Sequence, residues 1–189
     1  QNLEASTTNE PYLIVDIGFS STKLAFLRGH RGNELFKDIK ATPDTLTEIM
    51  ELRTLSRGSS EIVEWMADKK NLSLADAEKW LVHRAEILMD DKATEAAKSG
   101  GMSLETSDEI KTALRPVVVE IYQTLQAFRG QHDIVPQTAY LTGGVAQLKG
   151  FREFLEHELR LRVVVWDFFK GFDSSQVKLA PAHRSEFAM

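Results

Sequence analysis

The stretch Val15-Asp16-Ile17-Gly18-Phe19-Ser20-Ser21-Thr22-Lys23 decides the fold, because it joins two runs of residues that favour β-strands. The first run is Tyr12 to Val15 and the second is Thr22 to Leu27. A plain hairpin needs only Asn-Gly or Asp-Gly at its turn. This turn has a carboxylate, a glycine and hydroxyl side chains, which are groups that a metal ion and phosphates require. The stretch alone leaves two alternatives open, a plain hairpin and a hairpin whose turn binds phosphate.

The composition describes an ordinary globular protein and excludes several classes of function. With 189 residues, 42% of them hydrophobic and 27% charged, the chain can form one core with a smaller lobe attached. Its net charge of −5 offers no basic excess for nucleic acid, so no nucleic-acid partner is expected. The absence of cysteine excludes disulfides and thiolate metal sites. No apolar run approaches the ~20 residues of a membrane helix.

The order of the predicted elements indicates a mixed α/β fold. A three-stranded antiparallel meander is expected over 11–40, with turns at 18–21 and 28–33 and its third strand at 35–39. Residues 43–55 remain ambiguous between a short helix capped by Thr45 and a closing strand at 52–55. Two more strands are expected, at 138–142 and 163–166. Four helices are predicted. The first follows the loop 57–61, and the others cover 74–89, 107–128 and 148–159.

The same pattern divides the chain into a core and an insertion. Residues 1–10 are polar and are expected to form a flexible tail, and 89–102 contain Gly100-Gly101 and read as a flexible linker. The core is predicted to be 11–56 together with 105–189. A small helical subdomain would be inserted between them, at about 57–104.

Three strands, then helices, then strand, Gly-Gly, helix and strand is the order in one ribonuclease-H-like lobe of actin-like proteins. Residues 15–22 resemble the second phosphate-binding hairpin of that superfamily, and 142–151 resemble its adenosine motif. Residues 57–62, followed by 72–78, are similar to the corresponding motif of the PilM, GspL and FtsA branch. Leu114-Arg115-Pro116 and Ser185-Glu186-Phe187-Ala188 also resemble PilM. The resemblance runs from about 11 to 189 and covers only the second half of such a protein.

This resemblance implies a site for ATP and Mg²⁺ that is complete only with a first lobe, which we expect to precede Gln1. Asp16 would hold the metal ion through water, and Glu78 would reach the ribose. The glycines after strand 138–142 would let a base or sugar approach without a β-carbon in the way. Because the two turns would end neighbouring strands, they are expected to face one cleft. The implied nucleotide-binding residues are Asp16, Gly18, Ser20, Ser21, Thr22, Glu78, Gly143, Gly144 and Val145.

Three positions depart from the family pattern. The family's A-E-x-x-K motif ends here in Leu81, and Lys79 is predicted to lie on another face of the helix. Phe19 stands where small residues are common, and the loop at Gly58 has one glycine where relatives often have two. These departures leave two alternatives open, an ATP-binding site and a degenerate site that does not hydrolyse ATP.

The function that the resemblance implies is an ATP-binding scaffold of a type IV pilus inner-membrane platform. It would lie on the cytoplasmic face, peripheral to the inner membrane, and recruit pilus or secretion inner-membrane proteins and the assembly motor ATPase. A weak ATPase activity is left open, and this lobe alone is expected to bind ATP weakly and to be inactive. In the PilM group the partner's short tail docks on the other lobe.

Two alternatives remain. The first is a GspL-type scaffold of type II secretion with a degenerate nucleotide site. The second is a sugar or acid kinase of the same superfamily, whose general-base carboxylate would come from the first lobe.

Overall fold

The structure is a computed structural model, and it describes residues 11–31, 45–89 and 102–166. Several predictions therefore fall outside the described residues. They are the tail at 1–10, the strand at 35–39, most of the linker at 89–102 and the PilM-like residues 185–188.

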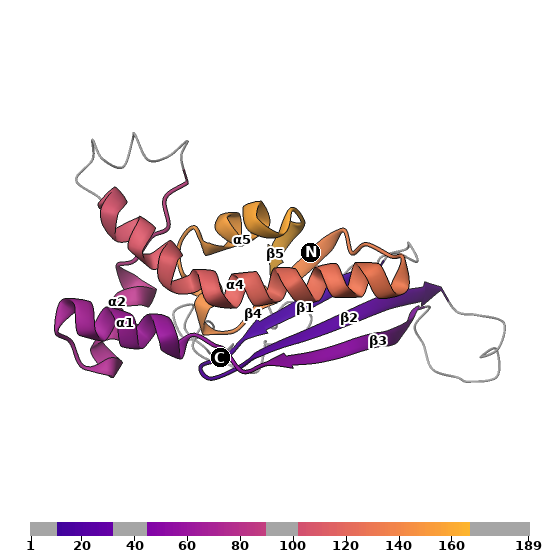
Figure 1. Cartoon of the computed structure of the whole chain (residues 1–189), viewed down its shortest axis with the longest axis horizontal. Coiled ribbons are helices and arrows are strands. Elements are labelled where there is room, and N and C mark those ends of the chain that lie inside the picture. The colour runs from indigo at the N-terminus through magenta and orange to yellow at the C-terminus, as the bar shows by residue number, and fades with distance from the viewer. Residues whose placement is uncertain (1–10, 32–44, 90–101, 167–189) are drawn as a thin grey trace, which may run out of the picture.

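One five-stranded mixed sheet organises the described residues (Figure 1). Its strand order is β3-β2-β1-β4-β5, in which β1, β2 and β3 are antiparallel and β4 and β5 run parallel to β1. The predicted mixed sheet with an antiparallel three-strand meander is thus confirmed. The strands are β1 Pro11–Ile17, β2 Thr22–Arg31, β3 Thr45–Leu55, β4 Thr138–Thr142 and β5 Arg162–Val165.

The third strand differs from the prediction in its position. Residues 28–31 belong to β2 and do not form a turn, because they pair with residues 45–48 of β3. Thr45 consequently begins a strand and caps no helix, and this strand is longer than the predicted 52–55. A bulge between Phe26 and Leu27 lets the two long strands stay paired.

Beside the sheet, the described residues form four α-helices and one 3₁₀ turn. Figure 1 shows α4 lying along the sheet with α5 beside it, and α1 and α2 together at one end. Pro116 lies inside α4 as predicted. None of the helices in the described part of the chain is long and apolar enough to cross a membrane. The elements are α1 Ser60–Lys70, α2 Leu74–His83, α4 Leu104–His132, the 3₁₀ turn η2 Gly144–Gln147 and α5 Phe151–Leu159.

The core lies between the sheet and α4. On β1, every second residue is fully buried, as the alternating pattern of a half-buried strand requires. On β2, the ring of Phe26 stacks on Phe128 of α4 with 4.0 Å between centroids.

Three helices have different bounds from those predicted, and α4, at Leu104–His132, extends beyond the predicted 107–128 at both ends. α2 ends at His83 and not at Met89, since the amide of Ile87 donates to the carbonyl of Lys149 at 2.8 Å. The amide of Leu88 donates to the buried hydroxyl of Ser107 at 2.8 Å. α5 begins at Phe151, after Gly150 has turned the chain with a positive φ of 78°. The Ser73 hydroxyl caps the start of α2, because it accepts a hydrogen bond from the Asp76 amide.

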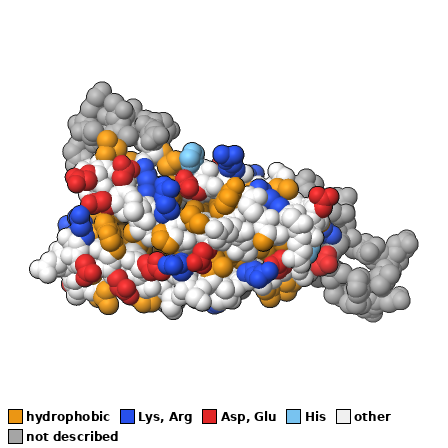
Figure 2. All heavy atoms as spheres, viewed as in Figure 1, with side chains coloured by type: hydrophobic (Ala, Val, Ile, Leu, Met, Phe, Trp, Pro, Cys, Tyr) orange, Lys and Arg blue, Asp and Glu red, His pale blue; other side chains and the backbone are white. Residues whose placement is uncertain are grey.

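Charged side chains of both signs are interspersed over the face of the molecule drawn in Figure 2. Several of them form ion pairs between elements, such as Lys69 with Glu109 at 2.7 Å and Lys149 with Glu86 at 3.1 Å. Each of these exposed pairs contributes only a few tenths of a kcal/mol to about 1 kcal/mol. The Lys69–Glu109 pair joins α1 to α4, whereas Lys149 and Glu86 lie outside the helices.

Candidate nucleotide site

The hairpin and the Gly-Gly turn leave the sheet at the same edge. Asp16 of β1 pairs with Thr142 of β4 in the parallel register, and each strand ends within one residue of that pair. The expectation that the two turns end neighbouring strands is therefore confirmed. The edge formed by the carboxyl ends of parallel strands is a common place for ligand sites in α/β folds.

The hairpin turn is closed by the Gly18 amide, which donates to the Ser21 carbonyl at 3.0 Å. The Ser20 side chain is exposed, and Phe19 at the tip is 52% exposed. Thr22 differs from them, because it is fully buried and its hydroxyl donates to the Arg57 carbonyl at 2.8 Å. The Thr22 hydroxyl therefore donates its hydrogen to the loop that contains Arg57, and not toward a ligand.

The loop between β3 and α1 is fastened to the hairpin tip. The Ser59 amide donates to the Gly18 carbonyl at 2.9 Å, and the Ser60 amide donates to the Phe19 carbonyl at 2.8 Å. Gly58 is buried between them, and a β-carbon there would stand 2.5 Å from the Gly18 oxygen and closer still to that of Phe19. The single glycine of the loop is therefore needed for backbone contact.

Arg57 connects this loop with two helices. Its Nε donates to Glu120 of α4 at 2.6 Å, and a terminal nitrogen donates to Glu61 of α1 at 2.5 Å. The hydrogen bond that Arg57 donates to Glu120, and then the charge of Glu61, raise the pKa of the guanidinium above its usual value. With or without these partners, the Arg57 guanidinium stays charged at any physiological pH.

A cavity of about 460 Å³ lies beside the hairpin, between α1, α2 and the turn after β4. Its volume is in the range of small-molecule sites. The walls are mainly apolar, with Ile62 and Val63 from α1, Leu81 from α2 and Leu148 after η2. Ser59 lines the cavity and also holds the hairpin, so one loop joins the two parts of the site.

The structure brings three predicted residues together in this cavity: Glu78, Gly144 and Val145. Glu78 is exposed on α2, and its carboxylate makes no hydrogen bond or ion pair with the described residues. Val145 is buried at the back of the turn. The hairpin residues from Asp16 to Thr22 are not among the lining residues. They are connected to the cavity by Ser59, which lines it and whose amide donates to the Gly18 carbonyl.

Gly143 does not line the cavity. Its φ is 94°, and a β-carbon there would stand 2.7 Å from the Ile17 carbonyl carbon. This glycine is needed because two backbone segments touch. The expected close approach of a nucleotide does not account for it.

Other residues of the cavity were missed in the sequence analysis. Lys79 lines the same cavity as Glu78, and it is exposed whereas Leu81 is buried, which agrees with its predicted placement on another face of α2 than Leu81. His83 lies one turn further along α2 and also lines the cavity, as does Gln147 in η2. Spacing of three to five residues from Glu78 along one helix could have indicated Leu81, Val82 and His83, whereas no local signal indicated Gln147.

The hairpin offers one carboxylate for a metal ion. Asp16 is half-buried, and it faces away from the core because it alternates with Val15 and Ile17. Carboxylate oxygen is a ligand that Mg²⁺ accepts, with water filling most of its other positions. The described residues contain no group of three His, Asp or Glu side chains that could hold a metal ion by themselves. Asp16 therefore fits a metal that is held mainly by water and by phosphate.

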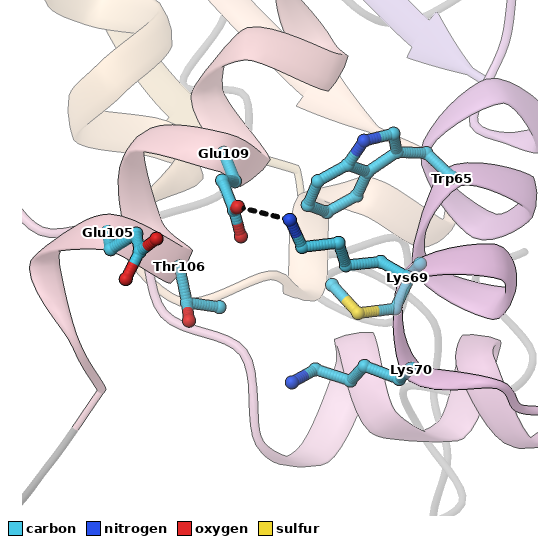
Figure 3. A pocket seen from close by; sticks show the side chains of 7 residues that line it. Trp65, Lys69, Lys70, Glu105, Thr106 and Glu109 are labelled. Atoms are coloured by element: carbon cyan, nitrogen blue, oxygen red, sulfur yellow. Dashed lines mark ion pairs between the residues drawn. The ribbon is translucent and has the colours of Figure 1, made fainter.

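A second cavity, of about 200 Å³, lies between α1 and the first turns of α4 (Figure 3). Figure 3 shows the Lys69 ammonium reaching across it to Glu109, beside Trp65. The hydrogen bond that Lys69 donates to Glu109 raises the pKa of Lys69. None of the predicted site residues lines this space, and two of its four charged residues, Lys69 and Glu109, already pair with each other.

A phosphate-type hairpin, a Gly-Gly turn and an inserted helical pair around one mixed sheet define a lobe of the actin-like class. Comparison with solved structures confirms this fold. A PilM-PilN type IV pilus biogenesis complex aligns with a TM-score of 0.55 and 24% identity, over 97% of this chain and 46% of that chain. The archaeal actin homolog Ta0583 in complex with ADP gives 0.52 and 15%, over 94% of this chain and 46% of that one.

MreB5 of Spiroplasma citri bound to ADP gives a TM-score of 0.51 and 14% identity, over 83% of this chain and 49% of that chain. The chain thus spans about half the length of the solved structures it matches. No protein-family model matches the sequence, and no curated protein matches it. This chain therefore has the actin-like fold.

Proposed function

We propose that this chain is the second lobe of an ATP-binding, actin-like scaffold protein of a type IV pilus inner-membrane platform. The observation that carries the proposal is the cavity that unites Glu78, Gly144 and Val145 and that shares Ser59 with the hairpin. A site built this way has an apolar compartment at one end and a turn with hydroxyls and a carboxylate at the other. A nucleotide matches these two parts, because its base can contact the apolar compartment and its phosphates can contact the polar turn.

The adenosine of the nucleotide would occupy the cavity, with its base against the apolar walls. The Glu78 carboxylate at the rim can accept hydrogen bonds from ribose hydroxyls, since no described residue holds it. The phosphates would extend past Ser59 toward the exposed Ser20 and the half-buried Ser21. Asp16 would hold a magnesium ion through water, and that ion would neutralise phosphate charge. A first lobe would complete the phosphate site from the opposite side.

The pilus role is proposed on the alignment with a PilM-PilN complex, which covers nearly the whole of this chain. The protein would lie on the cytoplasmic face of the inner membrane and bind other components of the pilus machine, including membrane proteins and the assembly motor ATPase. Bound ATP would hold the two lobes in a closed arrangement, and hydrolysis of the ATP would be slow or absent.

A second candidate is a degenerate scaffold of the GspL type. Leu81 favours it, because this buried side chain gives the cavity an apolar wall where the family motif has lysine. The engaged hydroxyl of Thr22 favours it as well, since it leaves one donor fewer for phosphate. ATP binding by the full-length protein distinguishes the two candidates.

Titration calorimetry of the full-length protein with Mg-ATP tests the nucleotide site. We expect micromolar binding, and Glu78→Ala should weaken it about tenfold, the loss expected for one or two hydrogen bonds to a charged group. Glu64→Ala is the matched control, because Glu64 is an exposed glutamate on α1 that does not line the cavity. If the folded full-length protein binds no ATP at millimolar concentrations, the degenerate scaffold is correct.

The pilus role is tested in the organism that encodes the protein. Deletion of the gene should remove surface pili, and the wild-type gene should restore them. Loss of secreted proteins with normal pili would instead support the secretion candidate. A normal phenotype in both assays would contradict the scaffold role.

A further inference from the structure

We propose that Arg57 is a positioning residue that clamps the hairpin to the cavity wall and to α4. Through this clamp, binding of the terminal phosphates and the position of α4 would affect each other. The inference deepens the proposed function and rests on it. Arg57 belongs to no predicted set of ligand contacts, and it does not line the cavity. Arg57 would therefore affect nucleotide binding through the position of the loop that it holds.

The first half of the clamp is a set of backbone contacts. Two consecutive amides, those of Ser59 and Ser60, donate to two consecutive carbonyls at the hairpin tip, at 2.9 and 2.8 Å. The buried Thr22 hydroxyl donates to the carbonyl of Arg57 itself. The hairpin is thus bonded to the loop at three places, and Gly58 removes the β-carbon that would separate them.

The second half of the clamp is the Arg57 side chain. It reaches α1 through Glu61 and α4 through Glu120, with both carboxylates within 2.6 Å of a guanidinium nitrogen. Arg57 is 39% exposed, Glu61 40% and Glu120 35%, so the group is only partly in water. Two charge-assisted bonds from a single planar guanidinium fix the orientation of the loop more strictly than one would.

This arrangement has a consequence for ligand binding. The hairpin would contact the terminal phosphates, whereas the cavity would contact the adenosine. If Arg57 holds the hairpin, its loss should weaken binding of ATP much more than binding of adenosine. A residue that only stabilises the fold would weaken both equally or change neither.

The test uses the full-length protein with Arg57→Gln and, as a milder variant, Glu120→Gln, which removes only the partner on α4. Hydrogen exchange of the nucleotide-free protein should show the Ser59 and Ser60 amides exchanging about tenfold faster in Arg57→Gln. Affinity for Mg-ATP should fall about five- to tenfold, and affinity for adenosine should change less than twofold. Arg57→Lys should retain part of the effect, because an ammonium can still pair with one carboxylate.

Arg152→Gln is the matched control. Arg152 also makes two ion pairs, with Glu153 at 2.7 Å and Glu156 at 3.3 Å, and it is 43% exposed. It lies on α5 and should leave exchange and both affinities unchanged.

Unchanged exchange at Ser59 and Ser60 in both Arg57→Gln and Glu120→Gln overturns the clamp, whether or not ATP binds. An equal loss of ATP and adenosine affinity overturns the positioning role. Faster exchange in a protein that binds no ATP in its wild-type form retains the clamp and rejects the proposed function.

Discussion

Gly143 and Ile17 touch through their backbones, although 126 residues separate them in the chain. A β-carbon at 143 would stand 2.7 Å from the Ile17 carbonyl carbon and closer still to its oxygen. This contact holds the Gly-Gly turn against the strand that leads into the hairpin. The turn and the hairpin therefore keep a fixed distance before any ligand binds.

Gly143→Ala should destabilise the protein strongly. The residue would have a side chain at a φ of 94° and a clash with backbone that cannot rotate away. We expect a loss of about 2–4 kcal/mol in the free energy of unfolding, since strained positions cost ~1–3 kcal/mol before any clash is added. Urea denaturation measures it. Gly130→Ala is the control, because nothing lies within 4 Å of its β-carbon position in α4, and it should stabilise or be neutral.

This result changes how a glycine variant can be used to study the site. A bulky residue at 143 was expected to block a nucleotide, but it would first disturb the sheet edge. Loss of ATP binding in such a variant would therefore say nothing about contact with adenosine. Glu78, which is exposed and free of described partners, is the better position to change.

The fold was largely predictable because its signals are local. The β-rich run at 12–15, the turn at Gly18 and the apolar spacing along α4 each lie within a few residues. The third strand was misplaced for a different reason. Thr45 and Glu48 have the spacing of a helix cap, and only pairing with 28–31 of β2 makes the segment a strand.

The end of α2 shows the same limit. The apolar residues up to Leu88 match a helical period, yet the chain leaves the helix at His83. The amides of Ile87 and Leu88 find partners on Lys149 and Ser107, which are distant in sequence. For the site, the placement of Glu78 beside Gly144 came from the resemblance to a family. No pattern in the residues themselves could have shown that they line one cavity.

Ser107→Ala should destabilise the junction between α2 and α4. The Ser107 hydroxyl is fully buried and accepts the Leu88 amide at 2.8 Å, so its removal leaves a buried donor without a partner. We expect a loss of about 1–3 kcal/mol, the cost of an unsatisfied buried amide. Thermal unfolding followed by calorimetry checks it. Ser103→Ala, which removes the cap of the same helix, should cost about 1 kcal/mol. A smaller loss for Ser107 than for Ser103 would contradict the assignment.

Phe128→Ala should be among the most damaging changes in the core. The Phe128 ring stacks on Phe26 with an interplanar angle of 8° and is fully buried. Its removal leaves a cavity between α4 and the sheet, and we expect a loss of about 3–5 kcal/mol in the free energy of unfolding. Phe128→Leu keeps most of the volume and should cost less. Val119→Ala, an exposed position on the same helix, is the control and should change stability little. Equal losses at 128 and 119 would show that α4 does not pack as described.

Asp16→Asn tests the metal-binding role proposed for the hairpin, in the full-length protein. Asparagine keeps the size of the side chain but removes the charge that would hold a hydrated magnesium ion. Since no described residue pairs with the Asp16 carboxylate, the fold should tolerate the change. If the protein hydrolyses ATP, the rate should fall ~10²-fold or more, because the metal and the water that it positions are both lost. Binding of Mg-ATP should weaken, while binding of adenosine should stay the same. Lys23→Gln is the matched control, because Lys23 is exposed and lies opposite Asp16 in the register of β1 and β2. Equal hydrolysis and equal Mg-ATP affinity in Asp16→Asn and wild type, in a folded protein, would show that the hairpin has a purely structural role.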